Sequence, residues 1–297
     1  MNKLTLWVLV GLSGSGKSTI ATEIANKNPN TVIVSSDTIR EELTGDYENQ
    51  EHNEEVFKVF HNRIRKNLEN KKNVIADATN LTMKSRRAIM MKVNGLDIHK
   101  VCVIIPKPFE QCKIDNQNRK HAVPNEVLDK QIRRFQIPFY EEKYDEIIIY
   151  NLLKKGYEPN NISLERMKGF DQKNPHHAMD LFDHCKHASK LFSTKYTYPA
   201  RFRIGALYHD LGKLSTQTFD ENGVAHYLQH HCFGSYQFLT AMYVIGIDEV
   251  LDECFIINYH MMPFSWTTDK AKQRWKERFG EYKYKMLLDF NECDRAR

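Results

Sequence analysis

Short apolar runs alternate with longer amphipathic stretches along the first half of the chain. The apolar runs predict buried strands at 4–10, 31–36, 73–78, 98–106 and 146–151. Apolar residues spaced three or four apart predict helices at 17–27, 51–70, 82–94, 108–116 and 124–134. Strands that alternate with helices are typical of a three-layer α/β domain with a parallel sheet.

The pattern changes after residue 151. KKGYEPNNIS, at 154–163, is polar and rich in turn formers, so it predicts a linker. From residue 176 onward, apolar residues repeat at helical spacing and no strand is evident, which predicts a small all-α domain. We therefore expect an α/β domain at 1–153 and an all-α domain at 165–297.

Composition limits the number of domains, the kinds of partner and the cellular compartment that we expect. The 297 residues leave room for two domains, and the net charge of +5 is compatible with a nucleic-acid partner without demanding one. Six cysteines include no C-x-x-C pair, which favours a reducing compartment over a disulfide framework. The first apolar run leads into GLSGSGKST rather than a cleavage site, so we expect a cytoplasmic protein with no membrane partner.

A phosphate-binding loop follows the first predicted strand. GLSGSGKS fits G-x-x-x-x-G-K-[ST] and opens a predicted helix, which is the context that this motif requires. Its glycines let backbone N–H groups wrap a phosphate, Lys17 bridges the β- and γ-phosphates, and Ser18 ligates Mg²⁺. The residues expected to bind ATP, or another nucleoside triphosphate, are Gly11, Ser13, Gly14, Ser15, Gly16, Lys17, Ser18 and Thr19.

Polar residues follow the second and third strands. In SSDTIR, Asp37 can accept a proton from an attacking hydroxyl and Arg40 can hold an acceptor phosphate; alternatively, Asp37 caps a helix. After the third strand, Asp77 can act on Mg²⁺ through water. Asn80 and Arg86 are candidates to bind an anionic substrate, although basic residues here can also form a solvated helix face.

A basic loop follows the fourth strand. Residues 119–124 (RKHAVP) precede a short helix, and together they suit a mobile lid. Such a lid would bring an arginine onto the transferring phosphoryl group and exclude water. Arg133 and Arg134 are interpreted as ordinary surface charges.

These motifs resemble the 5′-polynucleotide kinases of phage and bacterial RNA- and DNA-end repair. The resemblance covers roughly 1–150 and rests on GLSGSGKST, SSDTIR, VIADATNL with the following RR, and NRKHAVP. It implies that Asp37 is the general base, that Arg40 binds the substrate phosphate and that Arg119 is the lid arginine, with Lys17 as the fourth catalytic residue. The D-x-x-R match narrows the class without proving a polynucleotide acceptor, because related kinases act on small metabolites.

Histidine is concentrated in the second half, where nine of the 13 histidines follow residue 170. His209 and Asp210 are adjacent in ALYHDLGKL, and further candidates lie on nearly every predicted helix: His184, His230, His231, His260 and Asp294. A helical bundle can bring such residues together around one or two divalent ions. A structural role is expected for His176, His177 and His187, and a loop position for His226.

The order H…HD…D, with HDLGK and H-x-x-x-G-S, resembles the HD phosphohydrolase superfamily over roughly 175–297. The resemblance implies that His184, His209, Asp210 and Asp294 bind one metal ion. It further implies that His230 and His260 bind a second ion, that Asp210 bridges both and is catalytic, and that Lys213 steadies the phosphate. His231 is the alternative to His230, and the metal can be Mn, Ni, Co, Fe or Zn.

A 5′-kinase joined to a metal phosphohydrolase predicts an end-healing enzyme. One half would phosphorylate the 5′-OH of RNA or DNA, and the other would remove a 3′-phosphate or 2′,3′-cyclic phosphate, upstream of a ligase. One alternative is a small-molecule nucleoside or nucleotide kinase fused to an HD nucleotidase. Another is a nucleotide-sensing regulatory protein with an inactive HD domain.

Overall fold

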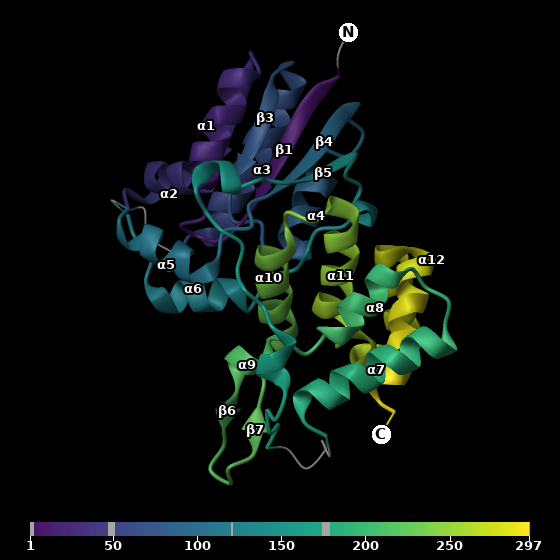
Figure 1. The fold of residues 1–297 in the computed structure, drawn as a ribbon. Helices are drawn as coiled ribbons and strands as arrows, with labels where there is room; N and C mark the ends of the chain where they lie inside the picture. The colour runs from purple at the N-terminus through teal and green to yellow at the C-terminus, as the bar shows by residue number, and fades with distance from the viewer. Residues whose placement is uncertain (1–2, 47–50, 120, 174–178, 297) are drawn as a thin grey trace. The chain divides into compact units, whose positions relative to one another are not determined.

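The computed structural model describes residues 3–46, 51–119, 121–173 and 179–296, and its chain forms two compact units (Figure 1). The N-terminal unit contains Met1–Gln131 and Pro138–Glu158, and the helical unit contains Ile132–Ile137 and Pro159–Arg297. Each unit is described separately below. The expectations for His176 and His177 fall outside the described residues.

The N-terminal unit is built on a parallel sheet with the strand order β2-β3-β1-β4-β5. Its strands are β1 (Leu4–Val10), β2 (Thr31–Ser35), β3 (Asn73–Asp77), β4 (Ile98–Ile104) and β5 (Glu146–Ile149). Every strand overlaps an apolar run of the sequence, because a strand covered on both faces must be apolar on both. The expected α/β domain with a parallel sheet is confirmed.

Helices connect these strands (Figure 1). They are α1 (Lys17–Lys27), α2 (Ser36–Thr44), α3 (Asn53–Glu69), α4 (Met83–Lys92), α5 (Phe109–Gln117) and α6 (Asn125–Ile132). A short 3₁₀ turn, η1 (Tyr140–Glu142), precedes β5. The connections place the carboxyl ends of β1, β2 and β3 at one edge of the sheet, and this edge is where open α/β sheets bind ligands.

Two short 3₁₀ turns precede the helices of the second half: η2 (Leu153–Lys155) belongs to the N-terminal unit, and η3 (Leu164–Met167) belongs to the helical unit. Its helices are α7 (Leu181–Lys195), α8 (Ala200–Leu207), α9 (Lys213–Thr216), α10 (His230–Met242), α11 (Ile247–Tyr259) and α12 (Asp269–Asp294), with the turn η4 (Met262–Ser265) before α12. The α12 helix breaks at Gly280, whose φ is 73°. The second half of the chain is therefore helical, as the apolar spacing predicted.

One hairpin interrupts the helices of this unit. Its antiparallel strands, β6 (Thr218–Phe219) and β7 (Ala225–His226), are two residues long each and flank a turn with Gly223 at a φ of 73°. No strand was expected in this part of the chain, and that expectation is wrong. Strands of two residues show no alternating pattern in the sequence, so nothing indicated them. His226 lies in β7 rather than in a loop.

The segment Ile132–Ile137, which begins at the last residue of α6, belongs to the helical unit. Phe135 and Ile137 are fully buried. The Asn258 side chain accepts a hydrogen bond from the Ile137 N–H at 2.8 Å and donates one to the Phe135 carbonyl at 3.0 Å. The Tyr259 hydroxyl donates to the Ile137 carbonyl at 3.1 Å. The helical unit therefore includes a segment that lies outside the expected 165–297 range.

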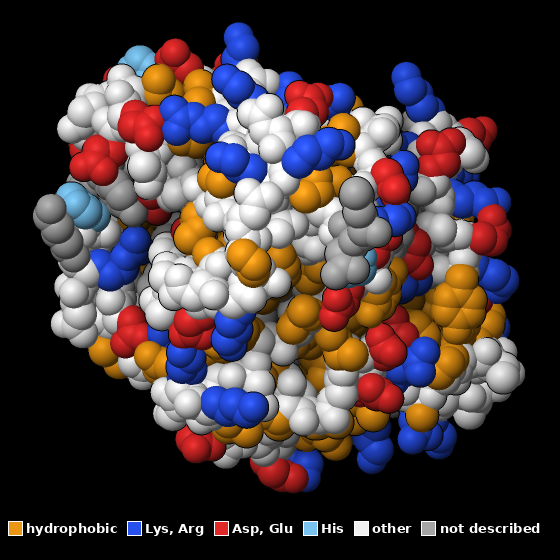
Figure 2. Space-filling view, turned by 90° about the horizontal axis from the view of Figure 1, so that it is seen from above, with side chains coloured by type: hydrophobic (Ala, Val, Ile, Leu, Met, Phe, Trp, Pro, Cys, Tyr) orange, Lys and Arg blue, Asp and Glu red, His pale blue; other side chains and the backbone are white. Residues whose placement is uncertain are grey.

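The charged side chains on one face of the molecule form no single patch. Figure 2 shows one face of the molecule, on which basic and acidic side chains are interspersed rather than gathered in one basic patch. Among the described residues, every helix is too short or too polar to span a bilayer.

Two of the expected substrate ligands, Asn80 and Arg86, have hydrogen-bond partners within the N-terminal unit. Arg86 is fully buried and donates two hydrogen bonds to Glu142, from Nε to Oε2 at 2.8 Å and from Nη2 to Oε1 at 2.6 Å. Asn80 is also buried, and its amide donates to the backbone carbonyl of Leu9 at 2.9 Å. Both side chains therefore stabilise the fold, and their expected role as substrate ligands stays a prediction.

Replacing Arg86 should destabilise the N-terminal unit more than it affects ligand binding. We expect Arg86→Met to lower the free energy of unfolding by about 3–5 kcal/mol, because Glu142 is left as an uncompensated buried charge. The double variant Arg86→Met/Glu142→Leu should recover most of this loss. Urea unfolding of the full chain, followed by circular dichroism, measures both changes. Lys84→Met, on the exposed face of the same helix, is the control.

Candidate phosphate site and candidate metal centre

The loop between β1 and α1 has the shape of a phosphate-binding loop. Gly14 and Gly16 adopt φ values of 79° and 91°, which residues with a side chain rarely adopt. A Cβ atom at Gly14 would lie 2.2 Å from the Cys112 carbonyl oxygen, so only glycine fits at this position. The loop leads directly into the N-terminus of α1, where backbone N–H groups and the helix dipole favour an anion.

Ser18 and Asp77 provide the expected magnesium position. The Ser18 hydroxyl donates to Asp77 Oδ2 at 2.9 Å, across the ends of α1 and β3. Burial raises the pKa of the Asp77 carboxyl, whereas Lys17 and the Ser18 hydroxyl oppose this shift. Hydroxyl and carboxylate oxygens are the ligands that Mg²⁺ prefers. These two residues would hold Mg²⁺ beside the nucleotide phosphates.

Lys17 lies within reach of several charged groups at this edge. Its Nζ donates to the Leu12 carbonyl at 2.8 Å. Burial lowers the pKa of the Lys17 ammonium, the carboxylates of Asp77 and Asp37 oppose this shift, and Arg119 adds to it. Asp37 and Arg119 are 82 positions apart in the sequence. The structure places both close enough to Lys17 for their charges to shift its pKa.

Asp37 is not the helix cap that the sequence left open as an alternative. Ser35 caps α2 and accepts the Thr38 N–H at 3.4 Å, so the half-buried Asp37 carboxylate is not needed for capping. Arg40 lies one turn further along α2, is 4% exposed and donates to Asn53 Oδ1 at 2.8 Å. The proton-accepting role of Asp37 and the phosphate-binding role of Arg40 stay predictions.

Sequence reasoning missed Gln131, in the last turn of α6. Its Oε1 accepts the Ser13 N–H at 2.8 Å, and its Nε2 donates to the Ser13 hydroxyl at 2.9 Å. The helix that was expected to belong to a lid therefore contacts the phosphate-binding loop through one amide. A single glutamine inside a predicted helix gives no signal in the sequence.

The helical unit brings all six predicted metal ligands together around Asp210. Asp210 Oδ2 lies 3.6 Å from His184 Nε2 and 3.3 Å from His209 Nε2, and Oδ1 lies 3.0 Å from His230 Nε2 and 3.5 Å from His260 Nε2. Asp294 Oδ1 completes the first set, at 3.1 Å from His184 and 3.0 Å from His209. Each oxygen of Asp210 thus faces a different pair of histidines.

Hydrogen bonds to the backbone orient three of these rings. His209, His230 and His260 use Nδ1 for the carbonyls of Ala206, Tyr227 and Ile257, at 2.8, 2.9 and 2.9 Å. In a neutral ring this leaves the Nε2 lone pair facing Asp210, which is the tautomer that binds a metal ion.

The donor set fits a divalent transition metal. His209 Nε2 is buried without a hydrogen-bond partner. His230 Nε2 and His260 Nε2 lie 3.3 Å apart beside a carboxylate oxygen. Nitrogen and oxygen lone pairs that converge in a buried site need a shared proton or a cation between them. The three-residue groups whose ligand atoms lie close enough to share an ion include His184–His209–Asp294 and Asp210–His230–His260.

Close backbone contacts explain why His230, and not His231, faces Asp210. A Cβ atom at Gly212 would lie 2.0 Å from the His230 carbonyl oxygen, and one at Gly234 would lie 2.7 Å from the Gly212 nitrogen. These two glycines let α10 approach the turn after Asp210. Burial, together with His260 and His230, lowers the pKa of His231 to about 3. His231 belongs to none of the three-residue groups whose ligand atoms lie close enough to share an ion.

Lys213 is positioned by partners that the sequence did not reveal. Its Nζ lies 2.7 Å from Asp210 Oδ2 and donates to Gln172 Oε1 at 2.8 Å. The Tyr227 hydroxyl in turn donates to the Gln172 carbonyl at 2.7 Å. Burial alone would raise the pKa of the Asp210 carboxyl, but Lys213 and His209 hold it well below its usual range.

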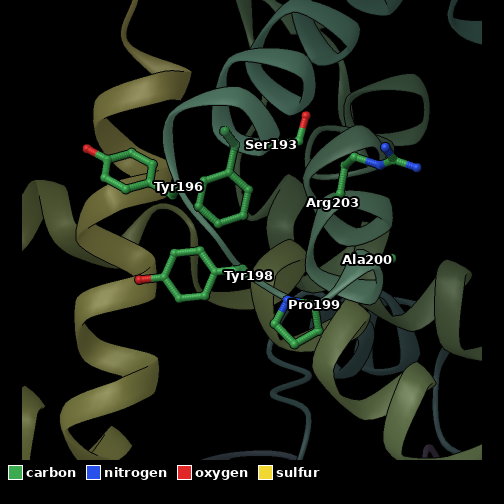
Figure 3. Close-up of a pocket in the computed structure, with 7 residues that line it drawn as sticks. Ser193, Tyr196, Tyr198, Pro199, Ala200 and Arg203 are labelled. Carbon is green, nitrogen blue, oxygen red and sulfur yellow. The ribbon is translucent and has the colours of Figure 1, made fainter.

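A separate recess lies on the surface of the helical unit. It has a volume of about 230 Å³ and is lined by Phe192, Ser193, Tyr196, Tyr198, Pro199, Ala200 and Arg203. In Figure 3 the two tyrosine hydroxyls point toward α12 and the Arg203 side chain extends away from it. The recess contains no residue of the metal cluster, so it is not the candidate site.

Comparisons with known proteins match the N-terminal half of the chain. Residues 6–138 match the family model described as "AAA domain". A curated relative, the L-seryl-tRNA(Sec) kinase of Methanococcus maripaludis, is 31% identical over 145 residues, which are 47% of this chain and 56% of that protein. The chain therefore spans little more than half the length of this relative.

Solved structures resemble the chain only distantly. A chain of the Pnkp1/Rnl/Hen1 RNA repair complex has a TM-score of 0.41 and 24% identity, covering 49% of this chain and 47% of that one. A fungal RNA kinase has a TM-score of 0.36 and 15% identity, covering 56% and 80%. The N-terminal unit has a phosphate-binding loop and a parallel sheet of the kind typical of P-loop kinases.

Proposed function

We propose that this protein heals broken nucleic-acid ends, with a 5′-hydroxyl kinase in the N-terminal unit and a metal-dependent phosphohydrolase in the helical unit. The observation that supports the proposal is that each unit brings together side chains of the types that phosphoryl transfer and metal binding require. The N-terminal unit gathers Lys17, Ser18, Asp77 and Asp37 at one sheet edge, and the helical unit gathers histidines and aspartates around Asp210.

In the kinase reaction, the 5′-hydroxyl oxygen attacks the γ-phosphorus of ATP. The bond between this phosphorus and the β–γ bridging oxygen breaks, ADP leaves, and the hydroxyl proton passes to the Asp37 carboxylate. Lys17 stabilises the charge on the phosphates. Arg40 holds the phosphate next to the acceptor hydroxyl, and Arg119 from the lid region stabilises the transferring group.

In the hydrolase reaction, water attacks the phosphorus of a 3′-phosphate or a 2′,3′-cyclic phosphate. A P–O bond to the ribose breaks, and the leaving oxygen takes up a proton. Bound divalent ions supply Lewis-acid activation of water and charge neutralisation. His184, His209, Asp210, His230, His260 and Asp294 would hold these ions, and Lys213 would position a phosphate oxygen.

A second acceptor class is favoured by one observation. The curated relative that shares 31% identity with this chain is named a kinase of L-seryl-tRNA(Sec). A seryl hydroxyl carried on tRNA is also an alcohol attached to RNA, so the same P-loop and general base suit it. The acceptor assay therefore compares a 5′-OH oligonucleotide, a nucleoside and seryl-tRNA, each with γ-labelled ATP and Mg²⁺.

Asp37→Asn should remove the kinase activity and spare the hydrolase activity. Losing a general base lowers the rate by about a hundredfold to ten-thousandfold. The measurement is transfer of label to a 5′-OH oligonucleotide, while removal of its 3′-phosphate is followed in the same tube with a transition metal present. Glu41→Gln, exposed on the same helix, is the matched control. Full kinase activity in Asp37→Asn, or labelling of nucleosides alone, would contradict the end-healing proposal.

Asp210→Asn should remove metal binding and 3′-end hydrolysis but leave the kinase intact. In protein freed of metal by chelation, Mn²⁺ added at about a hundred times its dissociation constant should stabilise the wild type by about 2.7 kcal/mol. The rise in thermal midpoint measures this effect, and Asp210→Asn should show none. Asp220→Asn, whose carboxylate pairs with His226 in the exposed hairpin, is the control. A wild-type protein with no metal-dependent rise would overturn the metal centre.

A further inference from the structure

Cys185 lies at the metal cluster although no motif pointed to it. It follows His184 in α7 and is fully buried. Its sulfur, a ring nitrogen of His209 and a carboxylate oxygen of Asp210 all lie within 4.8 Å of one another. Two of these three groups are already candidate ligands of the proposed metal centre.

The sulfur shares its surroundings with a buried ring nitrogen that faces two carboxylates. His209 Nδ1 is engaged by the Ala206 carbonyl, so Nε2 is the nitrogen available to other ligands of this cluster. This Nε2 is buried, and two carboxylate oxygens face it, Asp294 Oδ1 at 3.0 Å and Asp210 Oδ2 at 3.3 Å. A buried ring nitrogen in this position is a second, independent indication that a cation belongs among these side chains.

We propose that the Cys185 thiolate is a ligand of the ion held by His209 and Asp210, which makes the centre a mixed nitrogen, oxygen and sulfur site. The inference rests on the proposed metal centre and extends it. On binding, the S–H bond breaks, an S–metal bond forms and one proton leaves to solvent, with no change in oxidation state. A soft sulfur ligand favours Co²⁺, Zn²⁺ or Cd²⁺ over Mn²⁺.

The competing interpretation is that Cys185 only fills space between α7 and α8. Burial raises the pKa of the Cys185 thiol, and the charge and hydrogen bond of His209 oppose this shift. A coordinated divalent ion deprotonates a thiol outright, so a raised pKa in the absence of an ion is compatible with ligation. Spectroscopy separates the two interpretations, because only a bound sulfur changes the electronic spectrum of the metal.

The test is Co²⁺ titration of the metal-free full chain, followed by its near-ultraviolet and visible spectrum. We expect a thiolate-to-Co²⁺ charge-transfer band in the wild type and in Cys254→Ala, a control at a fully buried cysteine of the same unit. The band should be absent in Cys185→Ser, and the Co²⁺ affinity of this variant should fall about tenfold or more. Its Mn²⁺ affinity should change little.

The outcomes separate this inference from the function on which it rests. If the wild type binds Co²⁺ without the charge-transfer band, Cys185 is not a ligand and the metal centre stands. If the wild type binds no Co²⁺, the metal centre and this inference both fail. Cys185→Ala serves in place of Cys185→Ser if the serine variant does not fold, which circular dichroism decides. A band that persists in either folded variant overturns the proposal.

Discussion

The helical unit depends on the burial of one carboxylate. Asp210 is 3% exposed, and a buried carboxylate is tolerated only when opposite charge and hydrogen-bond donors surround it. Lys213 is its nearest cationic partner, and four histidine rings complete the surroundings. These groups come from α7, the turn after α8, α9, α10 and the residue after α11, so nearly every element of the unit is positioned relative to this carboxylate.

Both candidate sites use glycine to bring backbone segments closer than any side chain allows. In the N-terminal unit, Gly14 lets the phosphate-binding loop pack on the Cys112 carbonyl. In the helical unit, Gly212 and Gly234 let α10 meet the turn that follows Asp210. In both units, close packing of the main chain therefore positions the candidate site residues. Main-chain packing holds them more rigidly than side-chain contacts alone.

Much of the fold was predictable because local patterns record it. The apolar runs marked all the strands of the parallel sheet, and the spacing of glycines around Lys17 marked the phosphate-binding loop. His230 was preferable to His231 because it stands four residues before Gly234, and the structure shows the close contact behind that spacing. These features depend on residues that are near one another in the chain.

The features that escaped prediction depend on distant partners. Arg86 forms a salt bridge with Glu142, which lies 56 positions later in the sequence. No local pattern indicates this pair, so the sequence left Arg86 as a candidate substrate ligand. Gln131 and Gln172 act through single amides, for which no motif exists. The segment Ile132–Ile137 begins at the end of α6, yet its backbone hydrogen bonds go to Asn258 and Tyr259 of the helical unit.

The geometry of Asp210 bears on how many ions the proposed centre would hold. Its Oδ2 faces His184, His209 and the ammonium of Lys213, whereas its Oδ1 faces only His230 and His260 among these groups. One ion cannot use both sets fully, because the two oxygens of a carboxylate point in different directions. Asp210 would use both sets if it held one ion on each oxygen. Lys213 already supplies positive charge on the Oδ2 side, so the demand for an ion is greatest where the His230 and His260 nitrogens converge on Oδ1.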